Sequence, residues 1–95
     1  MKVRNLENRQ GRNVVNQFVI FDGDKIYFQS YESLVAVWNE KTCKLKLGRD
    51  WDYSRTTVKY LKIFTDYYTP YALDTKKEIE KLIKTGEIEY DSSMN

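Results

Sequence analysis

The apolar side chains in the first half of the chain follow the period of β-strands. Residues 14–21 (VVNQFVIF) form a run rich in β-branched and aromatic side chains. Residues 25–31 (KIYFQSY) alternate between apolar and polar positions. The sequence DGD at residues 22–24 lies between the two runs and is typical of a tight turn. We therefore expect a β-hairpin that ends at Tyr31.

Two more strands are expected after this hairpin. Residues 34–38 (LVAVW) could also begin a helix at Ser33, but the β-branched Val35 and Val37 favour a strand. In residues 43–47 (CKLKL) the leucines alternate with lysines, which predicts leucines inside and lysines outside. This alternation is typical of an edge or half-exposed strand, where exposed lysines also discourage aggregation.

The apolar positions then change to a helical period. A first helix is expected to begin at Ser54 or Asp52, either of which can cap it, and to end before Pro70, which cannot continue a helix. Its apolar positions are Val58, Leu61, Phe64 and Tyr67 or Tyr68.

A second helix has clearer boundaries. Thr75 and Glu78 form a capping box, and Gly86 stands where a C-terminal glycine belongs. The acidic segment that follows contains Ile88 and Tyr90, which either add a short strand or pack locally.

The order of these elements predicts an α+β fold, with an antiparallel β-meander of about four strands followed by two α-helices packed on one face. Residues 1–13 are polar and basic, which predicts a flexible N-terminal arm. Residues 14–90 are then a single domain, and residues 91–95 are a frayed tail.

Composition limits the class of protein. The chain has 95 residues, of which 32% are charged and 15% aromatic, with a net charge of +2. This is the composition of one small globular domain. It contains no run of 18 apolar residues that would cross a membrane and no signal peptide, so we expect a cytoplasmic protein.

The residue types exclude several kinds of chemistry. The chain has no histidine and one cysteine, Cys43, so Ser-His-Asp triads, Cys-His pairs and zinc sites built from these residues are impossible. Cys43 is interpreted as a half-buried strand residue, with a reactive thiol as the alternative. Asp22 and Asp24 could ligate a metal, but a hairpin turn is the simpler interpretation. Asp50 and Asp52 are better suited to helix capping than to acid–base catalysis. We predict no enzyme, cofactor or metal site.

The charges are unevenly distributed. Residues 41–62 carry seven basic side chains and two acidic ones, whereas residues 74–95 are acidic. Solvated surfaces would explain this pattern, and so would docking on an acidic protein. A small nucleic-acid-binding accessory protein is the alternative function, because cations neutralise phosphates and aromatic rings stack on bases. Its candidate residues are Lys44, Lys46, Arg49, Trp51, Arg55 and Lys59.

Three tyrosines cluster around the proline that ends the first helix. Tyr67, Tyr68 and Tyr71 could pack between the helices, and any that is exposed would be a good interface anchor. The candidate surface for a protein partner combines these tyrosines with Lys44, Lys46 and Arg49.

Three segments carry a resemblance to a known family. NQFVI (16–20), YFQSYES (27–33) and WDYSRTTVKYL (51–61) resemble a family of short, uncharacterised proteins from phages and mobile elements of gut bacteria. The resemblance covers roughly residues 1–85, including the later segment KKEIEKLIKTGE. The family it resembles has no assigned activity, so the resemblance supplies a context rather than a mechanism. That context implies a small phage-type protein that binds and inhibits a host protein, such as a CRISPR effector nuclease, in the manner of anti-CRISPR proteins.

Overall fold

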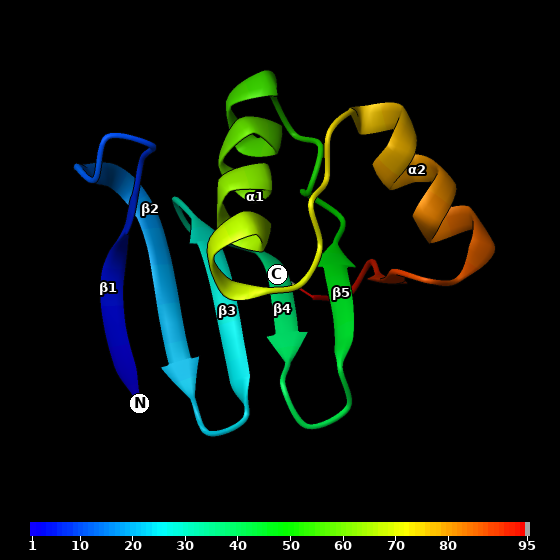
Figure 1. Cartoon of the computed structure of the whole chain (residues 1–95), viewed down its shortest axis with the longest axis horizontal. Coiled ribbons are helices and arrows are strands. Elements are labelled where there is room, and N and C mark those ends of the chain that lie inside the picture. The colour runs from blue at the N-terminus through cyan, green and yellow to red at the C-terminus, as the bar shows by residue number, and fades with distance from the viewer. Residues whose placement is uncertain (95) are drawn as a thin grey trace.

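The computed structural model describes residues 1–94, in which the chain forms a six-stranded sheet and two helices (Figure 1). The strands are β1 (Lys2–Glu7), β2 (Asn13–Asp22), β3 (Lys25–Ser30), β4 (Ser33–Asn39), β5 (Lys44–Gly48) and β6 (Glu89–Asp91). The helices are α1 (Arg55–Tyr68) and α2 (Lys76–Thr85). Strands lie in the sheet in chain order, antiparallel from β1 to β5, while β6 pairs parallel to β5. The predicted α+β class is confirmed, but the sheet has six strands rather than about four.

The hairpins expected from the sequence are present. Asp22 pairs with Lys25 at the end of the β2–β3 hairpin, and Gly23 between them has φ of +59°, which suits glycine. The segment that could have begun a helix at Ser33 is strand β4, in agreement with its β-branched residues.

The prediction of a flexible arm at residues 1–13 is wrong. Strand β1 pairs along β2, and the Leu6 side chain is fully buried. The turn after β1 is closed by the Asn8 side chain, whose Oδ1 accepts from the backbone N–H groups of Gln10 and Arg12 at 2.9 and 3.0 Å. One buried leucine and a closed turn therefore bring this polar segment into the sheet, and the domain begins at β1 rather than at residue 14.

Of the two alternatives for the segment around Ile88 and Tyr90, the short strand is the one present. Ile88 is buried, and β6 adds to the edge of β5. After β6, the chain passes close to Gly48. A Cβ atom added to Gly48 would lie 2.9 Å from the carbonyl oxygen of Met94. The segment predicted to fray is therefore packed as far as Met94, and residue 95 lies outside the described residues.

The helix ends follow the sequence closely. Ser54 caps α1 by accepting from the N–H of Thr57 at 3.1 Å. Thr75 caps α2 in the same way, and Gly86 ends it with φ of +85°. No helix in the described part of the chain is long and apolar enough to cross a membrane.

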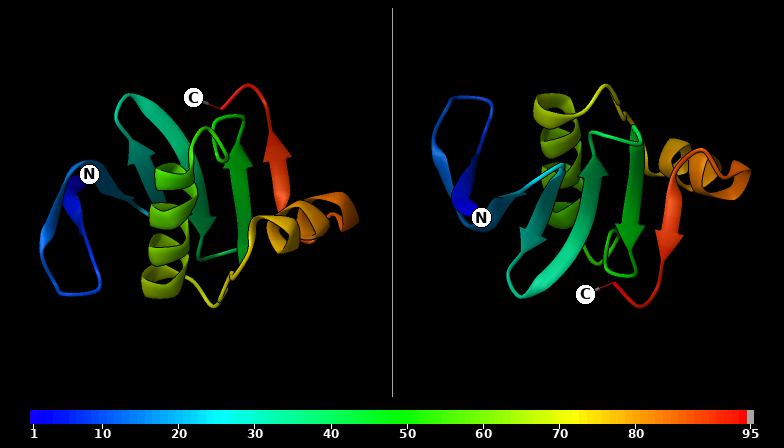
Figure 2. Two further views of the ribbon diagram at one scale, coloured as in Figure 1. Left: turned by 90° about the horizontal axis from the view of Figure 1, so that it is seen from above. Right: turned by 90° about the horizontal axis from the view of Figure 1, so that it is seen from below.

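Both helices lie on the same side of the sheet (Figure 2). Helix α1 crosses β3 and β4, and the Phe64 ring stacks on Phe28 with centroids 5.6 Å apart. Because side chains alternate along a strand, the neighbours of Phe28 point to the opposite face. The register places Tyr27, Val37 and Lys46 together on that uncovered face.

Candidate functional site

A surface pocket of about 830 Å³ lies where the N-terminus of α1 meets the ends of β3 and β4. The described residues that line it include two carboxylates and several hydroxyl groups. They are Asn16, Ser30, Tyr31, Glu32, Ser33, Val35, Asp50, Tyr53, Ser54, Thr56 and Thr57. In Figure 1 this is the upper end of the molecule. The size is within the range of ligand-binding pockets.

One wall is built from two residues with left-handed backbone conformations. Asn16 has φ of +64° and Tyr31 has φ of +54°, and the Tyr31 N–H donates to the Asn16 carbonyl at 2.7 Å. Asparagine tolerates this conformation, but it is uncommon for a bulky tyrosine. It ends the β2–β3 ladder and leaves the Tyr31 side chain 63% exposed at the pocket.

A second wall is the segment between β5 and α1, which contributes Asp50, Tyr53 and Ser54. Trp51 is only 5% exposed and anchors this segment in the core, whereas Tyr53, two residues later, is 81% exposed. The Ser33 hydroxyl donates to Oδ2 of Asp50 at 2.9 Å and so connects the two walls. Burial of Trp51 and the hydrogen bond from Ser33 to Asp50 thus fix the position of the segment between β5 and α1. Two exposed tyrosines, Tyr31 and Tyr53, and the carboxylates of Glu32 and Asp50 line the pocket.

The hydroxyl groups at the start of α1 are engaged within the protein. Ser54 Oγ caps the helix and lies 3.0 Å from Thr57 Oγ1. The side-chain oxygens of Ser33, Ser54 and Thr57 therefore all have hydrogen-bond partners within the fold.

The chain matches the family of unknown function DUF8033 over residues 1–82. It belongs to this family. Neither a curated protein nor a solved structure matches the DUF8033 protein.

The three segments that carry the sequence resemblance meet at the pocket of the DUF8033 protein. Asn16 comes from the first, Tyr31 and Glu32 from the second, and Tyr53 and Ser54 from the third. Tyr31 and Glu32 were not among the residues predicted for a site, whereas Tyr53 was noted only as an aromatic residue of the basic segment. The three segments are far apart along the chain, so the sequence did not indicate that they share a pocket.

The predicted tyrosine anchors have structural contacts on the helix side of the sheet. Tyr68 packs against Phe21 and Phe64, with ring centroids at 5.7 and 5.5 Å. Tyr71 meets the Trp38 ring edge-on. Tyr67 is 44% exposed, but its hydroxyl donates to the Asn8 carbonyl at 3.1 Å. These tyrosines thus connect parts of the fold.

The environment of Tyr71 keeps its hydroxyl protonated. Burial, with a smaller contribution from the Glu87 carboxylate, raises the pKa of Tyr71. The protonated hydroxyl donates to the Glu87 carbonyl at 3.4 Å. Tyr71 therefore contacts the segment that leads into β6.

The structure does not bring the predicted protein-binding residues together. Lys44 and Lys46 project from the uncovered face of the sheet, while the three tyrosines lie on the helix side. Arg49 is exposed just after β5. The candidate residues therefore lie on two faces of the sheet, and their role in binding a protein partner stays a prediction.

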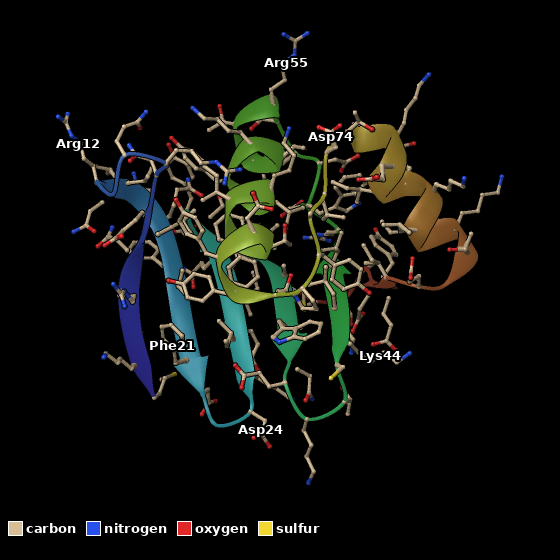
Figure 3. The ribbon with its side chains drawn as sticks, viewed as in Figure 1. Arg12, Phe21, Asp24, Lys44, Arg55 and Asp74 are labelled. Atoms are coloured by element: carbon tan, nitrogen blue, oxygen red, sulfur yellow. The ribbon has the colours of Figure 1, made fainter. Side chains whose placement is uncertain are left out.

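The predicted nucleic-acid surface is also divided. The Trp51 ring is buried and cannot stack on a base. Arg55 and Lys44 lie at opposite ends of the molecule (Figure 3). The Lys59 ammonium lies 5.3 Å from the centroid of the Tyr60 ring. The basic segment is thus distributed over several surfaces.

The remaining candidate residues lie in turns. Asp22 and Asp24 flank the β2–β3 turn, and no three metal-ligating side chains come together within residues 1–94. Cys43 is exposed in the β4–β5 turn with φ of +56°, so its predicted half-buried strand position is wrong.

Proposed function

We propose that this protein acts by binding another protein through the pocket beside α1. The observation that carries the proposal is the pair of exposed tyrosines, Tyr31 and Tyr53, that both line the pocket. Tyrosine offers a large contact area at low entropic cost, so exposed tyrosines beside a pocket are good anchors. In this proposal the binding is non-enzymatic, and the hydroxyl groups and carboxylates of the pocket act as hydrogen-bonding groups. In its narrower form, taken from the resemblance to phage proteins, the partner is a host nuclease such as a CRISPR effector, which binding inhibits.

The first test compares tagged variants of the protein in lysate of the host cell. Replacing both Tyr31 and Tyr53 with serine is expected to reduce capture of the specific partner about tenfold or more, because the two anchors are lost. Captured proteins are measured by quantitative mass spectrometry. The matched control replaces Lys44 and Lys46 with alanine, on the other face of the sheet. Equal capture by all three proteins, or a loss only in the lysine variant, would contradict the proposal.

Nucleic-acid binding gives a second prediction. We titrate the protein into single-stranded DNA, duplex DNA and RNA and follow fluorescence anisotropy. We expect no salt-sensitive binding, that is, no affinity that falls steeply between about 50 and 200 mM salt. The physical reason is that Lys44 and Arg55 lie far apart on the molecule and Trp51 is buried. If binding fell steeply with salt and was lost on mutation of Arg49, Arg55 and Lys59, the accessory-protein alternative would replace our proposal.

A further inference from the structure

We infer that the pocket recognises a basic side chain, with an arginine guanidinium or a lysine ammonium as the central group of the ligand. This inference rests on the proposed function and specifies the chemistry of the protein partner. The carboxylates of Glu32 and Asp50 both line the pocket, and none of its described lining residues is a lysine or an arginine. Neither carboxylate is in an ion pair within residues 1–94.

The two carboxylates retain capacity to accept hydrogen bonds from a ligand. A carboxylate offers about four lone-pair sites, and the Ser33 hydroxyl occupies one on Asp50. A guanidinium presents five N–H donors in a planar fork that matches carboxylate oxygens. Such donors would satisfy Asp50 without disturbing its bond to Ser33.

The exposed tyrosines favour the same ligand. Tyr31 and Tyr53 are 63% and 81% exposed, and both line the pocket. Aromatic faces attract cations, and arginine also stacks its plane on them. Carboxylates and aromatic rings together thus provide two kinds of attraction for one cationic group.

The N-terminus of α1 opposes a cation, so the magnitudes must be compared. A helix N-terminus is equivalent to about half a positive charge, and its effect falls off within the first turn. Glu32 and Asp50 carry two full negative charges. The Ser54 side chain also satisfies one of the free N–H groups at that terminus. Among the groups that line the pocket, the two carboxylates therefore outweigh the helix terminus.

The pocket is larger than one side chain. A volume of about 830 Å³ accommodates a short peptide segment as well as its basic group. The ligand class is thus a basic segment of a partner protein. A peptide is a suitable probe, because it contains the proposed group without requiring the identity of the partner.

The test titrates labelled peptides into the full chain and follows anisotropy and ¹H–¹⁵N chemical shifts. The probes are a Gly-Arg-Gly-Arg-Gly peptide, the same peptide with lysine, one with glutamate, and one with citrulline, which keeps the shape of arginine without its charge. We expect the arginine or lysine peptide to shift the amide signals of Tyr31, Glu32 and Ser33 and to bind about tenfold more tightly than the citrulline peptide.

Substitutions of Glu32 and Asp50 test whether the peptide binds to these carboxylates. The double variant Glu32→Gln and Asp50→Asn is expected to bind the arginine peptide about tenfold more weakly. The control Glu40→Gln, in the distant β4–β5 turn, is expected to leave the affinity for this peptide unchanged. The amide spectrum of each variant shows that it is folded. Equal binding of citrulline, preference for glutamate, no binding of basic peptides, or shifts only outside the pocket would overturn the inference. If the tyrosine variant loses the cellular partner but the Glu32 and Asp50 variant keeps it, the proposed function stands and only the basic ligand is excluded.

Discussion

Replacing Phe64 with alanine is expected to lower the free energy of unfolding by about 3–5 kcal/mol. Phe64 is fully buried, and its ring lies 5.6 Å from that of Phe28 and 5.5 Å from that of Tyr68. Removing the ring deletes apolar burial and leaves a cavity between α1 and the sheet, which closely packed neighbours fill only in part. Since small domains are stable by about 5–15 kcal/mol, this substitution removes a large share of the total.

Urea unfolding provides the measurement for Phe64. Trp38 and Trp51 are buried, so their fluorescence reports loss of the core. The matched control is Tyr53→Ala, an aromatic side chain that is 81% exposed, for which we expect a change within about 0.5 kcal/mol. A loss below about 1 kcal/mol for Phe64→Ala would mean that this ring does not hold α1 on the sheet.

Replacing Leu6 with alanine is expected to lower the free energy of unfolding by about 2–5 kcal/mol. Leu6 lies in β1 and is fully buried, although the surrounding sequence is polar and basic. Its truncation would leave a cavity at the edge of the core and weaken the attachment of β1 to β2. A flexible arm would instead give a change close to zero, so this experiment separates the two descriptions of the N-terminus.

Val3→Ala in the same strand is the control for Leu6. The Val3 side chain is 56% exposed, so its removal creates no cavity and is expected to cost about 0.5 kcal/mol or less. Urea unfolding measures both variants, and amide hydrogen exchange along β1 reports whether the strand stays paired. Equal small effects at both positions would mean that residues 1–7 form a flexible arm rather than a strand of the sheet.

The turn after β1 has further contacts that sequence periodicity does not report. The Arg9 guanidinium forms an ion pair with Asp66 at 2.7 Å and lies 5.9 Å from the centroid of the Tyr67 ring. These residues are more than fifty positions apart in the chain. Only the position of α1 on the sheet brings them together. As a result Tyr67, which was predicted as an interface residue, is a neighbour of the turn after β1.

The candidate site shows the same limit. Helix caps and hairpin turns depend on residues within a few positions, so Ser54, Thr75 and Gly23 were identifiable from the sequence. The pocket depends on where β3, β4 and α1 end in space. The sequence placed Tyr31 at the end of a strand and Tyr53 among the aromatic residues of the basic segment. Only the fold shows that both line one pocket.

The sequence by itself determined the local elements of this protein. Apolar periodicity, capping residues and the glycine turn define four of the strands and both helices, because these features act between near neighbours. The tertiary structure alone decided that β1 and β6 join the sheet, that Lys44 and the tyrosines lie on opposite faces, and that Glu32 and Asp50 share a pocket. Those outcomes depend on burial and strand pairing between residues that are far apart in the chain. A single buried residue, such as Leu6 or Ile88, can be enough to bring an otherwise polar segment into the sheet.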